Sequence, residues 1–159
     1  MDTNTVLALA FGLGVIAGLR ALTAPAVVCW AAHWKWLNLD LSPLSFMATT
    51  VAASIFAVLA LGELVNDKLP KTPSRKALPA FIARIVMGGL SGAALCSAAG
   101  DSWPLGAVLG GVGAVAGTFG GYDARKRLVK ALQTRDLAIA LLEDAIAVGG
   151  AFFLVSRFV

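Results

Sequence analysis

Charged side chains inside apolar segments are the residues of this sequence whose types could do chemistry. Arg20 lies in the middle of an apolar run from Val6 to Ala32. A permanent cation at membrane depth is costly, so it requires a partner or a water-filled cavity. The other ionisable residues within or beside apolar segments are Glu63, Asp67, Lys68, Arg84, Glu143 and Asp144. Together with Arg20 they form the candidate pathway for an ion or a small polar solute.

The composition predicts what surrounds these charges. Apolar residues make up 58% of the 159 residues and charged residues only 14%, and the mean hydropathy is +0.83. A water-soluble domain of this size needs a more polar surface. We therefore predict a single integral membrane domain over residues 1–159, all-α, with its core covered by the lipid bilayer.

Five apolar segments follow one another, each near the ~20 residues that a helix needs to cross about 30 Å of hydrocarbon. The first is longer than one crossing requires and contains Pro25, which predicts a kink or break just after Arg20. The predicted crossing helices cover residues 5–32, 44–65, 77–99, 104–122 and 136–157.

Basic residues predict the orientation, because Lys and Arg concentrate in cytoplasmic loops. Nine of the thirteen lie after the second or the fourth segment, so we expect a multi-pass protein with these two loops and the N-terminus in the cytoplasm. All four tryptophans then fall at the outer interface. The same loops explain the isoelectric point of 9.4 without a nucleic-acid partner, since they face anionic headgroups. The nine residues are Lys68, Lys71, Arg75, Lys76, Arg125, Lys126, Arg127, Lys130 and Arg135.

Depth along straight helices predicts which charges meet. At ~1.5 Å per residue, Arg84 and the pair Glu143-Asp144 lie about 10 Å in from the cytoplasmic edge, and Glu63 is near that level. We therefore predict that Arg84 pairs with Glu143 or Asp144. Arg20 lies deeper, ~22 Å from that edge, with no obvious partner at its level. It is expected to snorkel, to reach a carbonyl at the Pro25 break, or to face a polar cavity.

Glycine patterns suggest how the helices pack. The spacing of Gly12, Gly14 and Gly18 in the first segment is echoed by Gly111, Gly113 and Gly117 in the fourth. Small residues at this spacing let helices approach closely, so tight packing is the first interpretation. Under the predicted topology these two segments run in opposite directions, which resembles an inverted two-helix repeat of the kind common in transporters.

No cofactor or metal site is expected. Cys29 and Cys96 stand alone in apolar segments, and His33 lies beside tryptophans at an interface. Neither a Cys/His cluster nor a Ser/His/Asp order is present, which disfavours an intramembrane enzyme.

A family resemblance supports the same residues. The motif G-L-R-A at residues 18–21, the run E-L-V-N-D-K-L-P at 63–70, Arg84 with Gly88, and L-E-D at 142–144 resemble the small bacterial integral membrane proteins grouped as domain of unknown function 4126. The resemblance implies a helical protein of the bacterial inner membrane and no established chemistry. The chain has K-T-P-S-R at 71–75, where some members have an acidic residue after the proline, so an acidic role does not transfer there.

Two functional hypotheses remain. We call Glu63, Arg84, Glu143 and Asp144 the charged layer. In a transporter or channel, Arg20 and this layer would bind an ion or small polar solute while carboxylates exchange protons. In a structural membrane protein, the same charges would lock helices together. The lone Arg20 and the echoed glycines favour transport. Five crossings leave little room for a central pathway, so we also expect a homo-oligomer, such as a dimer, packed through a glycine face.

Overall fold

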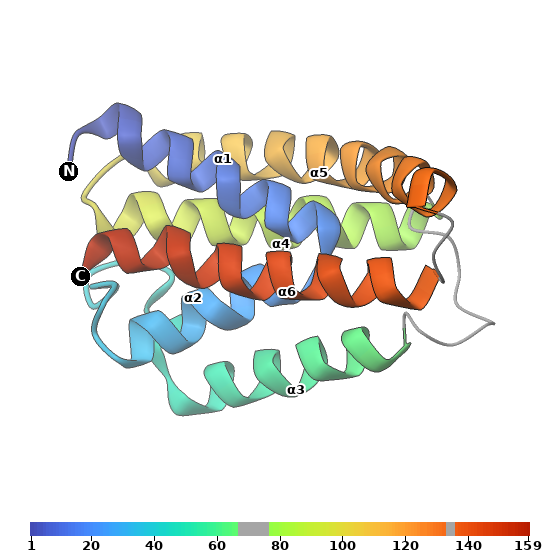
Figure 1. Cartoon of the computed structure of the whole chain (residues 1–159). Coiled ribbons are helices and arrows are strands. Elements are labelled where there is room, and N and C mark those ends of the chain that lie inside the picture. Colours follow the sequence, from blue (N-terminus) through green and yellow to red (C-terminus); the bar gives the residue numbers. More distant parts are fainter. Residues whose placement is uncertain (67–76, 133–135) are drawn as a thin grey trace.

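The computed structural model describes residues 1–66, 77–132 and 136–159 and is helical in nearly all of them, which confirms the all-α prediction (Figure 1). No strand occurs in the described ranges. The elements are α1 Thr3–Leu19, α2 Thr23–His33, η1 Ser45–Ala48, α3 Thr50–Asn66, α4 Leu78–Ala98, α5 Trp103–Leu132, α6 Asp136–Val155 and η2 Ser156–Phe158.

A capping residue outside the apolar run starts α1. The Asp2 carboxylate accepts hydrogen bonds from Thr5 N at 3.0 Å and Thr5 Oγ1 at 2.7 Å. These bonds satisfy a backbone donor that has no intrahelical partner, and they hold the pKa of Asp2 below its ordinary value. Stabilisation by this cap is therefore present at neutral pH and lost as the pH falls through the folded-state pKa.

The first apolar run reverses direction instead of crossing. At one end, Thr3 Oγ1 donates to Asp101 Oδ1 at 2.9 Å, which places the start of α1 beside the α4–α5 loop. After α2 the chain returns to the same end, where Ser42 Oγ donates at 3.0 Å to Ser97 Oγ in the last turn of α4. We call residues 3–33 the α1–α2 hairpin and residues 20–22 its tip. The break predicted after Arg20 is confirmed, but the prediction of one crossing helix over 5–32 is wrong.

Helices α3 to α6 run alternately in opposite directions, and both termini lie at one end (Figure 1). By length and composition, three described helices can cross a membrane: Leu78–Ala98, Trp103–Ala131 and Ala138–Phe158. The apolar helices α1 and α3 have 17 residues each, about 25 Å. Membrane-crossing helices are therefore supported, and the expected number of five is not confirmed.

Glycine contacts join α1 to α5, as the packing interpretation predicted. A Cβ atom on Gly14 would overlap the carbonyl oxygen of Gly110, and one on Gly18 would overlap that of Ala114. Contacts therefore advance along both helices together, so α1 and α5 run parallel (Figure 1). The inverted relation predicted for the two glycine patterns is wrong, because the hairpin restores the chain to its starting end before α3.

Helix α4 completes this tightly packed group and contacts both α1 and α5. A Cβ atom on Gly88 would lie 2.7 Å from Gly110 O, and Gly92 and Gly106 approach each other in the same way. Such close approach is available only to residues without a side chain. These glycines thus make contacts within the chain, and the homo-oligomer packed through a glycine face remains a prediction.

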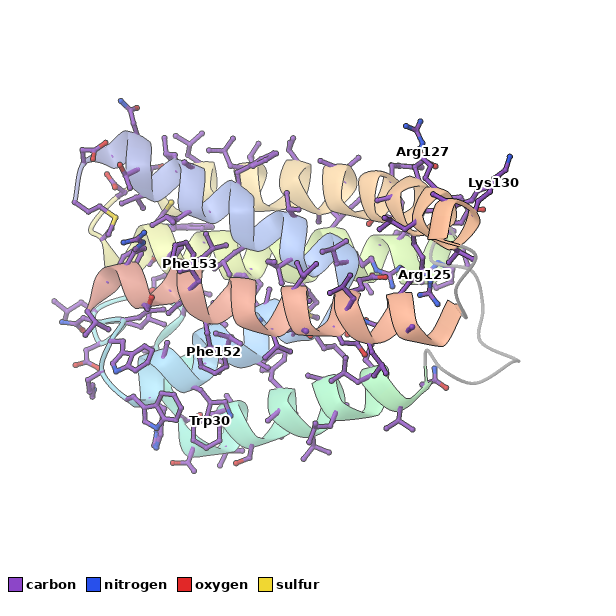
Figure 2. All side chains as sticks on the ribbon, in the orientation of Figure 1. Trp30, Arg125, Arg127, Lys130, Phe152 and Phe153 are labelled. Atoms are coloured by element: carbon purple, nitrogen blue, oxygen red, sulfur yellow. The ribbon has the colours of Figure 1, made fainter. Side chains whose placement is uncertain are left out.

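The tryptophans and the basic residues of α5 lie at opposite ends of the bundle (Figure 2). Trp34 packs against Trp30 and Trp36 with ring centroids 5.4 and 5.5 Å apart, and Trp103 starts α5 beside the loop that Thr3 contacts. Arg125, Arg127 and Lys130 lie at the far end of α5. The N-terminus therefore lies with the tryptophans, and the expectation that it shares an end with the basic loops is wrong.

Candidate functional site

The hairpin tip lies inside the protein, and Arg20 is its most buried side chain. Arg20 has an extended backbone, with φ −139° and ψ 107°, which ends α1 while its N–H still bonds Ile16 O at 2.8 Å. Its side chain has no exposed surface. The interrupted helix thus delivers backbone polar groups and a guanidinium to the same buried point. Irregular backbone at membrane depth requires such burial in protein, or a water-filled cavity.

Glu63 of α3 binds the backbone of the tip. Its Oε1 accepts from Ala21 N at 2.8 Å, and its Oε2 accepts from Leu22 N at 2.9 Å. These N–H groups precede α2, where the positive end of the helix dipole favours a carboxylate. Leu22 itself offers no side-chain cap to α2, so Glu63 supplies from another helix what the local sequence lacks.

Asp144 of α6 binds the side chain of the tip. Its Oδ1 forms an ion pair with Arg20 Nη2, and both side chains are almost completely buried. This contact corrects the expectation that Arg20 lacks a partner at its own level. The depth calculation treated residues 5–32 as one straight crossing, whereas the chain turns back at Arg20 and meets α6 there.

Thr118 of α5 binds the last turn of α1. Its hydroxyl donates to Ala114 O at 2.8 Å and also lies 3.3 Å from Gly18 O, a carbonyl at the end of α1 that needs a donor. Three helices therefore hold the tip and the last turn of α1: Glu63 and Asp144 bind the tip, and Thr118 binds the turn before it. Thr118 was not among the residues predicted from sequence; its place one residue after Gly117, in the glycine pattern that packs on α1, is the signal that could have revealed it.

Residues 7–157 match the family described as Domain of unknown function (DUF4126). The chain belongs to this family. The matched range contains the hairpin tip and all the residues that hold it, and it confirms the resemblance drawn from the motifs. No curated protein and no solved structure matches the chain.

The remaining candidate residues of this DUF4126 protein are Arg84, Glu143, Asp67 and Lys68. Arg84 of α4 is buried at 4% exposure, and its pairing with Glu143 or Asp144 remains a prediction. Glu143 Oε2 lies 3.7 Å from Arg125 Nη1 of α5, so the basic end of α5 contributes to the charged layer. Asp67 and Lys68, together with Pro70 of the family motif, lie outside the described residues.

In the described part of this DUF4126 chain, no group of three or more His, Cys, Asp or Glu side chains is placed to hold a metal ion. Cys29 and Cys96 are buried thiols of α2 and α4. His33 Nδ1 lies 3.3 Å from Ala48 O, a contact that fixes the end of α2 on η1.

Proposed function

We propose that this protein carries a small ion or polar solute across a membrane, and that the hairpin tip is the central element of the pathway. One observation carries the proposal: a helix is interrupted at a buried arginine, and carboxylates from two other helices bind the interruption. Interrupted helices that present their ends to ionisable groups form the substrate and coupling-ion sites of many transporters. Ionisable residues inside membrane proteins otherwise mark proton relays or ion pathways.

The geometry suggests how the site would work. Protonation of Asp144 would remove the negative partner of Arg20, and protonation of Glu63 would weaken its hold on Ala21 N and Leu22 N. Either event would leave a cationic or N–H donor surface at the tip, which an anion or a polar solute could bind. Proton exchange at these carboxylates would thereby couple to release or capture of the solute.

The proposed orientation places the basic end in the cytoplasm, since Lys and Arg concentrate on that side of an inner membrane. Both termini and the four tryptophans would then face outward. This topology retains the positive-inside argument and replaces only the predicted position of the N-terminus. The hairpin would enter and leave from the outer side as a re-entrant segment.

Flux measurements test the proposal. Proteoliposomes containing the protein and the pH-sensitive dye pyranine would receive potassium, sodium, chloride or acetate gradients, with protein-free vesicles as the baseline. We expect flux with at least one gradient, and we expect Asp144→Asn to abolish it. Asp40→Asn is the matched control, because Asp40 binds exposed Lys35 at 3.0 Å at the tryptophan end. A folded wild-type protein that moves none of these ions would contradict the proposal.

A structural role is the second candidate, and the direct Arg20–Asp144 pair favours it. If the charges serve only to lock helices, an apolar pair should replace them without functional loss. The variant Arg20→Met with Asp144→Leu separates the two hypotheses. Transport predicts a folded variant without flux, and a structural role predicts that any activity of the protein survives the exchange.

A further inference from the structure

A groove between α5 and α6 opens at the basic end of the molecule. Its volume is about 160 Å³. Most of its lining side chains are apolar, and one of them, Leu19, is the last residue of α1. The lining residues are Leu19, Gly121, Ala124, Arg125, Leu128, Ile139, Leu142, Glu143 and Ile146.

Charge is confined to one place in this groove. Arg125 lines it together with Glu143, and the two side chains are 3.7 Å apart, longer than the ~2.8 Å of a direct charge-assisted hydrogen bond. Figure 2 shows Arg125 pointing toward α6, whereas Arg127 and Lys130 point away from the bundle at the same end. A guanidinium has five N–H donors and can therefore bind two oxyanions at once.

The length of α5 fixes the depth of the groove. Its 30 residues extend about 45 Å, more than the ~30 Å thickness of the hydrocarbon layer. With Trp103 at the opposite interface, about 20 residues of α5 cross the hydrocarbon, so Arg125 lies at headgroup level. The apolar lining on the hydrocarbon side of Arg125 then faces acyl chains, while the Arg125 guanidinium faces phosphates.

We propose that this groove is a binding site for an anionic phospholipid, with an acyl chain against Leu19, Leu142 and Ile146 and the phosphate on Arg125. The apolar lining matches the acyl chain, and Arg125, the one basic residue among the described lining residues, matches the headgroup charge. The bound lipid would close the side of the bundle where α5 and α6 separate. This surface is separate from the hairpin tip, and lipid binding there does not depend on transport.

Lipid titration of the whole delipidated protein in detergent tests the site, with native mass spectrometry counting bound lipids. Phosphatidylglycerol should bind about fivefold more tightly than phosphatidylcholine with the same chains, the factor that corresponds to ~1 kcal/mol per basic side chain. Arg125→Gln should remove this preference. Arg127→Gln is the matched control and should keep it, because Arg127 does not line the groove.

The acyl-chain part has its own test. Ala124→Phe should fill the groove and weaken binding of both lipids, whereas Leu105→Phe, on exposed surface near the other end of α5, should not. If Ala124→Phe fails to fold, Ile146→Phe serves the same purpose from the groove's exposed edge. Equal affinity for the two lipids, or unchanged binding after Arg125→Gln and a filled groove, would overturn the proposal. So would a dimer whose formation excludes the lipid, since a second copy would then be the occupant.

Discussion

Arg20 combines three properties at one residue: it ends α1, it is fully buried, and it binds a carboxylate from α6. A buried ion pair gains little over apolar packing, but a buried charge left without its partner is strongly destabilising. The pair therefore favours the one arrangement of α1 and α6 that joins its members. This property is compatible with the proposed transport role, in which the pair would hold one geometry until a proton or solute binds.

Removing one member of the pair should cost far more than removing both. Arg20→Met or Asp144→Leu alone should lower the free energy of unfolding by ~3–5 kcal/mol, because each leaves a buried charge. The double variant should recover a large part of that loss. Denaturation in detergent, followed by circular dichroism, measures all three. Strictly additive losses would show that the two side chains do not interact.

Glu63 should stabilise the tip through its charge as well as its shape. Glu63→Gln keeps one acceptor oxygen but replaces the other with an amide donor facing Leu22 N or Ala21 N, so we expect a loss of about 1–3 kcal/mol. The neighbouring Gly62 has open space around it, and Gly62→Ala should raise stability by up to about 1 kcal/mol. Equal melting temperatures for Glu63→Gln and the wild type would argue against the capping role.

Arg84 provides a separate test of the charged layer. If it pairs with Glu143 or Asp144 as the helix depths predict, Arg84→Ala should cost ~3–5 kcal/mol. Adding Glu143→Ala or Asp144→Ala should then restore part of the stability. Urea or SDS titration of the three variants gives the coupling, and additive effects with both carboxylates would refute this pairing.

Three residues of the candidate site could be selected from the sequence, but several of their partners could not. Arg20, Glu63 and Asp144 stand out because charges are rare in apolar segments. Thr118 does not, since a threonine hydroxyl can bond its own helix and causes no conflict with its surroundings. The Arg20–Asp144 contact escaped prediction because depth was counted along a straight helix.

At the scale of the elements, the reversal at the tip explains the errors of topology. Apart from Arg20, the run from Val6 to Ala32 is predominantly apolar, and its hydropathy carries no information on chain direction. The bonds that stabilise the turn come from Glu63, 41 and 42 residues away along the chain. The break could be predicted from Pro25. The reversed direction of α2 could not, because it depends on contacts with Glu63, which is distant in the sequence.

The glycine contacts between α1 and α5 predict that the effect of a Gly→Ala substitution on stability depends strongly on its position along α5. Gly117→Ala would place a Cβ atom against Val15 O and should lower the free energy of unfolding by about 1–3 kcal/mol. A Cβ atom on Gly120, three residues later on the same helix, would have no neighbour within 4 Å, so Gly120→Ala should be neutral or stabilising. Thermal melts of both variants check the difference, and similar melting temperatures would deny that α1 and α5 are in close contact.

At the scale of the whole molecule, the hairpin sets the position of every later helix. Because residues 3–33 return to their starting end, α3 and α5 leave from the tryptophan end, and both termini finish there (Figure 1). A single crossing would have placed the N-terminus with the basic residues instead. The sidedness of residues near the two ends of the hairpin therefore decides between a re-entrant hairpin and a single crossing.

Cysteine labelling in sealed vesicles measures this sidedness directly. Asn4→Cys, Lys35→Cys and Lys126→Cys would each be made with Cys29 and Cys96 replaced by alanine, and treated with a membrane-impermeant maleimide in right-side-out and inverted vesicles. The hairpin predicts that positions 4 and 35 react from one side and position 126 from the other. Reaction of positions 4 and 126 from the same side, with 35 opposite, would contradict the hairpin and restore a single crossing for the first segment.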